Sequence, residues 1–529
     1  MIPLKDKDKP IIRKLLDAGC CARCILRFCC VAVQSAYRLS YEDICRELSA
    51  FVRDSEKEQT HDVTIQTQKD DPPQKKLKLE NSQAGEHDTS AAATVTAECG
   101  RDTAGASVCV VCLGVLQDFC NHGFAKKVAE AVKAENYEIE SLVLSVSLPA
   151  QLSVREHSCW LHIKKEVREK SMCLGKDDVI QVKEAFKWTL QTMVSKELRV
   201  PVLANSPFEV AVGFTHAETD ADCHFLATTC SDCFKPTKNK LSVFTRMAVV
   251  KALEKISDDK FCRNFPCPPT KPSTECSPQD ITCLHGSVFV AGRYNKFSRE
   301  LPQTPWVIDG ERRMEGSVEE LIAAPLLSSF RAEGFNFSSS GREDVDVRTL
   351  GNGRPFAMEL LNPHRSQFTK AEIRQLQEAI NQSSDKIRVR DLQIVTREAM
   401  SRMKEGEEEK TKSYSALIWT QRSIEKKDLE FIENIKELTI DQKTPLRVLH
   451  RRPLAVRQRV IHSMSASLLD CHHFTLRLRT QAGTYIKEFV HGDFGRTKPN
   501  LCDLMQTETD ILELDVESVD VDWPPAVPE

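Results

Sequence analysis

The sequence predicts an α+β protein with more than one domain. Its 529 residues correspond to about three domains of ordinary size. Short stretches in which apolar residues alternate, as in half-buried strands, recur together with segments that have the apolar spacing of helices. One interval, residues 52–107, has neither pattern. We therefore expect an N-terminal module, an insertion, a middle α/β domain over residues 121–289 and a C-terminal domain over residues 290–529.

Composition narrows the class of protein. Hydrophobic residues make up 41% of the chain, which is enough to bury cores, and a net charge of −4 means that a nucleic-acid surface must be local. No apolar run is long enough to span a bilayer, and residues 1–9 lack the apolar core of a secretory signal. Twenty-one cysteines in such a chain favour a reducing compartment, with thiols and metal ligands more common than disulfides.

The first 120 residues contain a helix signal, a polar interval and two cysteine pairs. Residues 41–51 have helical spacing, with Ser40 as the expected N-cap. Residues 52–107 are rich in charged and small polar residues, which predicts a disordered insertion. Within it, Lys75-Lys-Leu-Lys78 fits a weak nuclear-import signal or, more simply, solvated charge.

Two Cys-x-x-Cys pairs lie on either side of the insertion. Each pair can present two thiolates on one side of a tight turn, and two pairs complete a tetrahedral zinc site, with unligated thiols as the alternative. The predicted ligands of a structural zinc, in a module formed by residues 1–51 and 108–120, are Cys21, Cys24, Cys109 and Cys112. A third pair, Cys230 and Cys233, has no clear partner pair and is interpreted as structural thiols.

The middle domain alternates strands and helices. Strands are expected at residues 141–149, 208–214 and 287–291, and helices at 178–198 and 242–256. A basic cluster beside the second helix suits phosphate contacts or a solvated helix entrance equally well; it consists of Lys235, Lys238, Lys240 and Arg246.

The C-terminal domain has the densest pattern. Helices are expected at residues 318–327, 369–381 and, as a charged excursion, 400–410; strands are expected at 387–395, 413–420, 474–479 and 511–516. Ser366 or Thr369 suits the N-cap of the second helix, and Thr484 suits that of a helix after Gly483. Residues 443–459 carry six Lys or Arg and no acid, as in an exposed arm or strand pair that contacts phosphates.

A cluster of carboxylates follows a serine-rich turn in this domain. Glu343, Asp344 and Asp346 lie between Arg342 and Arg348, and extended backbone would place the two aspartates on one side. A carboxylate beside a glycine turn and flanked by arginines can stay ionised and act as a nucleophile. The alternative is a solvated charged turn.

Three separated stretches resemble the motifs of one family. Gly341-Arg-Glu-Asp-Val-Asp-Val-Arg348 resembles the aspartate motif of the pseudouridine synthases, Lys412-Ser-Tyr-Ser-Ala-Leu417 their tyrosine motif, and Gly483-Thr-Tyr-Ile-Lys487 their third motif. The continuation of the first motif to Phe356, with Arg293-Tyr-Asn-Lys-Phe-Ser-Arg299 upstream, resembles the Pus-ten branch of archaea and eukaryotes. The N-terminal part is similar to the accessory domain of that branch, a THUMP-containing RNA-binding domain with a four-cysteine zinc site.

The resemblance implies an isomerase without an organic cofactor. It would convert uridine to pseudouridine in the T-loop of tRNA, at positions 54 and/or 55, after turning the base out of its stack. Asp344 matches the nucleophile and Tyr414 the tyrosine that stacks on the base and assists proton removal. Lys487 matches the basic residue that pairs with the aspartate, where many relatives carry Arg. The implied fold is a mixed, largely antiparallel sheet with flanking helices.

The resemblance also implies two RNA-contacting loops, at about residues 304–317 and 442–457. Their candidate contact residues are Arg312, Arg313, Arg447, His450, Arg451, Arg452 and Arg457. We expect a monomer without membrane contact, in the nucleus and cytoplasm, with the mitochondrion left open. Two other classes were considered: a non-catalytic structured-RNA-binding protein, and a methyltransferase, for which Gly351-Asn-Gly353 fits poorly as a cofactor-binding turn.

Overall fold

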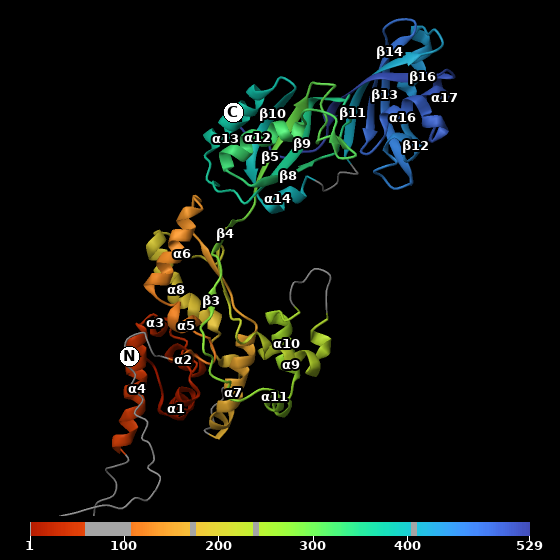
Figure 1. The fold of residues 1–529 in the computed structure, drawn as a ribbon. Coiled ribbons are helices and arrows are strands. Elements are labelled where there is room, and N and C mark those ends of the chain that lie inside the picture. Colours follow the sequence, from red (N-terminus) through yellow and green to blue (C-terminus); the bar gives the residue numbers. More distant parts are fainter. Residues whose placement is uncertain (1, 59–106, 170–175, 236–242, 404–409, 529) are drawn as a thin grey trace, which may run out of the picture. The chain divides into compact units, whose positions relative to one another are not determined.

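The computed structural model describes residues 2–58, 107–169, 176–235, 243–403 and 410–528. It divides into two compact units (Figure 1): unit 1, residues 1–135 and 139–283, and unit 2, residues 136–138 and 284–529. The Lys75-Lys-Leu-Lys78 stretch and most of the predicted insertion lie outside the described residues. Within the described ranges no helix has both the length and the apolarity that crossing a membrane requires.

Unit 1 contains a small sheet with helices before, between and after its strands. β1 (Val143–Ser147) and β2 (Phe208–Thr215) pair in parallel, and helices α7 (Gln151–Glu169) and α8 (Val182–Leu198) lie between them in the chain. The middle domain is therefore α/β, as predicted. The other elements are α1 (Lys9–Ala18), α2 (Ala22–Phe28), α3 (Gln34–Tyr37), α4 (Tyr41–Glu58), α5 (Val115–Asp118), α6 (His122–Ala134), α9 (His224–Thr229), α10 (Arg246–Lys255), α11 (Asp258–Asn264), β3 (Ser277–Pro278) and β4 (Thr282–His285).

The end of helix α4 in unit 1 was predicted wrongly. The helix begins after Ser40, whose hydroxyl accepts from the Asp43 backbone N–H at 3.1 Å, so the predicted cap is confirmed. It then continues through Glu58, seven residues past the predicted end and into the interval expected to be disordered. The residues after Phe51 include Arg, Glu and Lys, which have high helix propensity, so the composition that predicted disorder also permits a helix.

Unit 2 is organised on one ten-stranded sheet (Figure 1). Its order is β10-β5-β9-β16-β11-β14-β13-β12-β15, with β8 paired to β9. All pairs are antiparallel except β16 with β9, so the prediction of a mixed, largely antiparallel sheet is confirmed. The strands are β5 (Val288–Lys296), β8 (Gly334–Ser339), β9 (Arg348–Leu361), β10 (Ile387–Val395), β11 (Thr411–Thr420), β12 (Lys436–Lys443), β13 (Val456–Leu468), β14 (His473–Gln481), β15 (Thr497–Lys498) and β16 (Thr509–Val519).

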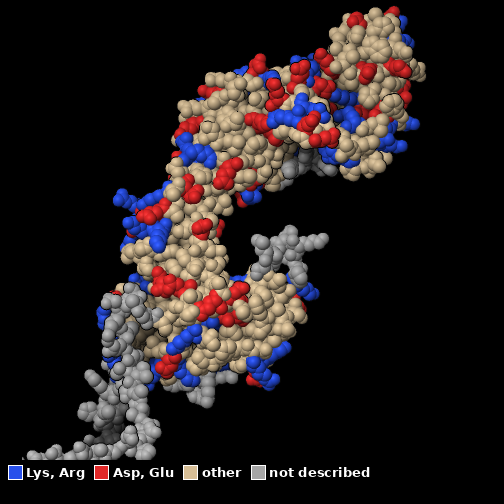
Figure 2. Space-filling view, in the orientation of Figure 1, with Lys and Arg blue, Asp and Glu red and all other residues tan. Residues whose placement is uncertain are grey.

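Two apolar cores cover the two halves of this sheet. Helices α12 (Val318–Phe330) and α13 (Lys370–Ser383) pack on the half that contains β5, β8 and β10. Helices α16 (Ile486–His491) and α17 (Leu501–Met505) pack on the half that contains β11 to β14. The remaining elements are the hairpin β6 (Val307–Ile308) and β7 (Glu311–Arg312), α14 (Arg397–Ser401) and α15 (Glu430–Asn434). On the face shown in Figure 2, acidic and basic side chains are mixed.

Several local predictions for unit 2 can be compared with these elements. Thr369 caps α13 in a capping box with Glu372, whereas Thr484 does not cap α16, because Tyr485 occupies that position. The helix expected over residues 400–410 is wrong in its described part: α14 ends at Ser401, and residues 404–409 lie outside the described residues. Gly351 lies inside β9, so no strand-to-helix turn of the kind a methyltransferase needs exists there.

Candidate active site

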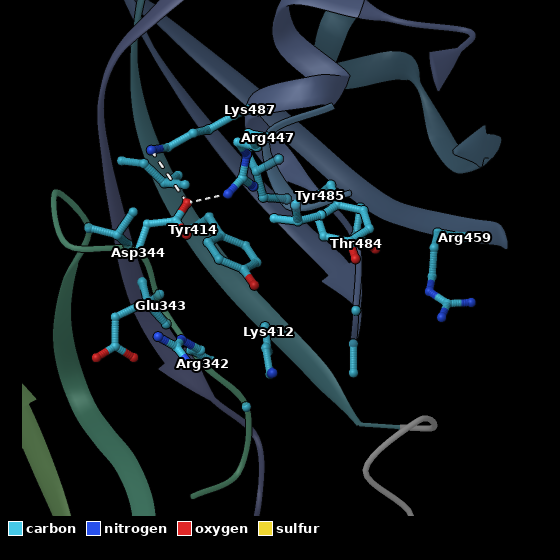
Figure 3. A pocket seen from close by; sticks show the side chains of 18 of the residues that line it. Arg342, Glu343, Asp344, Lys412, Tyr414, Arg447, Arg459, Thr484, Tyr485 and Lys487 are labelled. Atoms are coloured by element: carbon cyan, nitrogen blue, oxygen red, sulfur yellow. Dashed lines mark hydrogen bonds and ion pairs between the residues drawn. The ribbon is translucent and has the colours of Figure 1, made fainter. Parts of the chain in front are cut away.

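A cavity of about 620 Å³ in unit 2 collects the three motif stretches. Figure 3 shows Asp344, Tyr414 and Lys487 on its wall, from the loop between β8 and β9, from strand β11 and from helix α16. β11 pairs with β16, and β16 pairs with the start of β9. The order of strands in the sheet thus brings together three residues that are 70 and 73 positions apart along the chain.

Three cations lie near the Asp344 carboxylate. Its Oδ2 atom accepts from Arg447 Nη1 at 2.7 Å and lies 3.5 Å from Lys487 Nζ. Its Oδ1 atom has Arg451 Nη2 at 3.8 Å, and no described residue donates a hydrogen bond to it. Among the described residues, Oδ2 is therefore the hydrogen-bonded oxygen and Oδ1 is left without a hydrogen bond.

Lys487 forms ion pairs with two aspartates. Its ammonium lies 2.8 Å from both carboxylate oxygens of Asp346, closer than to Asp344. Burial would raise the pKa of Asp346, but Lys487 lowers it below its ordinary value. The two aspartates share a side, as expected, although the backbone turns at Val345 instead of running extended.

The two flanking arginines do not act as predicted. Arg348 makes a bidentate pair with Asp515 at 2.8 and 2.7 Å, and Arg342 is exposed with no ion pair to Asp344 among the described residues. The expectation that these neighbours hold the aspartate ionised is wrong, because β9 starts at Arg348 and turns its side chain towards β16. The cations that contact Asp344 come from elsewhere in the chain.

A buried polar network supports the loop that carries Asp344. Glu343 accepts from Arg354 Nε at 2.7 Å and from the Tyr294 hydroxyl at 2.8 Å, and all three side chains are buried. Lys296, also buried, donates to the backbone carbonyls of Asp344 and Val345 at 3.0 and 2.9 Å, and burial lowers its pKa to about 8. These hydrogen bonds therefore fix the backbone of the loop that carries Asp344.

Gly341 allows this loop to approach its neighbours. Its φ is +88°, and a Cβ atom there would lie 2.6 Å from Lys412 Nζ and 2.7 Å from Arg354 Nη1. A larger residue would be strained by the backbone and would displace two cations of the cavity wall.

Tyr414 lies on the cavity wall opposite the third motif (Figure 3). Burial is the main cause that raises the pKa of its hydroxyl above the ordinary value of tyrosine. The side chain is therefore a neutral phenol at pH 7, with its ring face available to the cavity. Thr484 and Tyr485 line the other side.

The two predicted RNA-contacting loops differ in how their arginines are used. In the β6–β7 hairpin, Arg312 is bonded to Glu320 at 2.6 Å, whereas Arg313 has only a 3.5 Å contact with Glu311. The second loop lies between β12 and β13. Its Arg451 and Arg452 line the cavity, His450 is exposed, and Arg457 donates to the Thr444 hydroxyl.

Two family models match consecutive parts of the chain after the insertion. "Pus10, C-terminal" matches residues 289–520 and "Eukaryotic Pus10, N-terminal" matches residues 109–283. A human protein named "tRNA pseudouridine synthase Pus10" is 58% identical over 100% of both chains.

The chain belongs to the Pus10 family. The predicted resemblance is thereby confirmed. A relative of the same name from Thermofilum pendens is 38% identical, but over 44% of this chain and 52% of its own. Among solved structures, a Cbf5-Nop10-Gar1 complex is similar at 14% identity and a TM-score of 0.24, over 43% of this chain and 48% of that chain; a score of this size carries no argument.

The N-terminal Pus10 unit contains the predicted cysteine cluster. Cys21, Cys24, Cys109 and Cys112 are buried, and their Sγ atoms all lie within 4.8 Å of one another. The Cys21 and Cys112 sulfurs are 3.7 Å apart, close to the spacing of about 3.8 Å that four Zn–S bonds of 2.3 Å in a tetrahedron require. The cluster can bind a metal ion. Cys230 and Cys233 belong to no such group among the described residues.

Two functional contacts of this Pus10 chain were missed in the sequence. Arg447 was expected to contact RNA, yet its guanidinium is occupied by Asp344 and by Glu488, which lies beside Lys487 in the third motif. Glu343 was treated as part of a charged turn, yet it is buried against Arg354. The signal in the sequence was that Glu343 and Glu488 each lie in or beside a motif, but the sequence does not show which residue pairs with them.

Proposed function

We propose that this chain isomerises uridine to pseudouridine in tRNA, the reaction that the names of its Pus10 relatives state for those proteins. The observation that carries the proposal is the meeting of Asp344, Tyr414 and Lys487 in one cavity. In this reaction the bond between C1′ and N1 breaks, the base turns, and C1′ is rejoined to C5. The proton on C5 is lost, and N1 takes up a proton.

Each side chain has a role in this proposal that follows from its surroundings. The Asp344 carboxylate is the nucleophile that forms the covalent intermediate with the substrate, since Arg447 and Lys487 contact one of its oxygens and hold the carboxylate in place. Tyr414 stacks on the uracil as a neutral phenol. Lys487 contributes to the positive charge around Asp344 and is anchored by Asp346.

The substrate must leave its RNA stack to reach this cavity. Arg451 and Arg452, at the mouth, suit the phosphates on either side of the turned-out nucleotide, and they carry no other motif role. We assign the target, more narrowly, to uridines of the T-loop. In the N-terminal unit, four buried thiols suit zinc better than harder cations, which prefer oxygen ligands, so we assign a structural zinc to this cluster.

Release of tritium from tRNA that contains [5-³H]uridine tests the reaction directly, because the C5 proton leaves only when C5 is rejoined. We expect Asp344→Asn and Asp344→Ala to abolish release and to retain tRNA binding. Asp385→Asn is the control: it changes an exposed aspartate of unit 2 that does not line the cavity and should retain turnover. Release by purified Asp344→Ala would refute the assignment. Mapping the modified positions in the same tRNA tests the T-loop.

A further inference from the structure

The starting observation is a buried carboxylate next to the third motif. The Glu488 side chain is 2% exposed and follows Lys487 on helix α16. A buried charge of this kind requires a partner of opposite sign. Arg447 supplies it, with Nε at 2.6 Å and Nη2 at 3.3 Å from the two carboxylate oxygens.

The same guanidinium then reaches the nucleophile. Arg447 uses Nη1 to donate to Asp344 Oδ2 at 2.7 Å (Figure 3). Because it also donates to Glu488, it bridges the two carboxylates. Desolvation opposes its charge, but Glu488 and Asp344 raise the pKa of Arg447, and the cation persists. Lys487 is 3.5 Å from the same oxygen and is drawn to Asp346. Arg447 is therefore closer to the Asp344 carboxylate than Lys487 is.

The backbone ties this cation to the basic arm, which we define as residues 444–455 between β12 and β13. Arg447 lies in a turn of 3-10 helix (Leu446–Val448), and the backbone N–H groups of Arg451 and Arg452 both donate to the Val448 carbonyl. Val448 is buried. The arginines that suit RNA phosphates and the arginine on Asp344 therefore share one short folded segment.

We propose that Arg447, fixed by the buried Glu488, is the positioning residue that orients Asp344 so that Oδ1 is the attacking oxygen, and that it couples the basic arm to the nucleophile. This inference rests on the proposed function. The charged groups that face or adjoin Asp344 are Arg447, Arg451, Lys487, Lys296, Arg342, Glu343 and Asp346. Of these, Arg447 alone both hydrogen-bonds the Asp344 carboxylate and is anchored to a buried acid.

The test compares single-turnover rates and tRNA affinities of Arg447→Gln, Glu488→Gln and Arg447→Lys with those of the unmodified protein. Arg447→Gln should lower the rate at saturating tRNA by about 100-fold, because the carboxylate is no longer oriented. Its tRNA affinity should fall much less, since Arg451 and Arg452 remain in the arm. Glu488→Gln should lower the rate less, and Arg447→Lys should restore part of it, since the cation remains but the guanidinium fork does not.

Controls separate this inference from folding and from the proposed function. Arg447→Gln leaves Glu488 buried without its partner, so the double variant Arg447→Gln/Glu488→Gln, which is uncharged at both positions, must show the same loss of rate. Arg477→Gln, an exposed arginine on β14, should behave as the unmodified protein. A folded double variant with the original rate would overturn the inference. If Asp344→Ala releases no tritium, the proposed function stands whatever the result for Arg447. If Asp344→Ala releases tritium, the proposed function and this inference both fail.

Discussion

The buried pair of Glu343 and Arg354 beneath the nucleophile gives a prediction whose size can be worked out. The two side chains are 1% and 2% exposed, and Arg354 Nε is 2.7 Å from Glu343 Oε2. Arg354→Met keeps an extended side chain of comparable bulk and removes the charge. Glu343 is then a buried carboxylate that has lost its contacting cation and keeps only the hydrogen bonds from the Tyr294 hydroxyl.

The cost follows from the lost partner. Removing one side of a buried, hydrogen-bonded ion pair costs about 3–5 kcal/mol, because the remaining charge is buried without compensation. The hydrogen bond from Tyr294 and the nearby Lys296 offset part of this cost, so we expect about 3 kcal/mol, the lower end of that range.

Hydrogen–deuterium exchange of peptides from β9 and β11 measures this quantity within unit 2. Glu343→Gln/Arg354→Met should lose less than the sum of the two single variants, because neither charge is then unpaired. A cost for Arg354→Met below about 1 kcal/mol, the size expected of a surface ion pair, would refute the reasoning.

Three further predictions concern other parts of the chain. Removal of metal by a strong chelator, or Cys24→Ser, should lower the unfolding temperature of unit 1 by calorimetry and leave that of unit 2 unchanged, since a structural zinc site is coupled to folding. Changing Arg451 and Arg452 together to Gln should weaken tRNA binding and reduce its salt slope by about two contacts, whereas an unchanged slope would mean a solvated surface. Burial lowers the pKa of His157 to about 4, so unit 1 should lose up to about 3 kcal/mol as pH falls from 6.5 to 4, and His157→Phe should remove this dependence.

Alternation and turn residues were sufficient to predict much of the sheet. The strand at Ile387–Val395 was predicted at its observed ends, because alternating apolar residues are bounded there by polar turns. The helix predicted over the charged segment after Met400 was wrong in its described part, because this segment has no apolar stripe to pack. The N-cap of α16 was misplaced by one residue, since Thr484 instead donates its hydroxyl to the Gln481 carbonyl.

Motif spacing predicted which residues meet in the cavity, but not which charges pair. Arg447 is 103 positions from Asp344, and it stands in a basic run whose members all look alike in the sequence. What distinguishes it is the burial of Glu488, a tertiary property that no local pattern encodes. The same holds for Glu343. It is buried because it pairs with Arg354 of β9, and the local sequence does not show this partner.

The place of β16 in the sheet has a consequence for its assembly. β16 joins the half that contains β9 to the half that contains β11, yet among the described strands it is the last along the chain. Until β16 pairs on both sides, the loop that carries Asp344 and the strand that carries Tyr414 belong to two unconnected sheets. The cavity that collects the two residues is therefore complete only when the final strand of the sheet is in place.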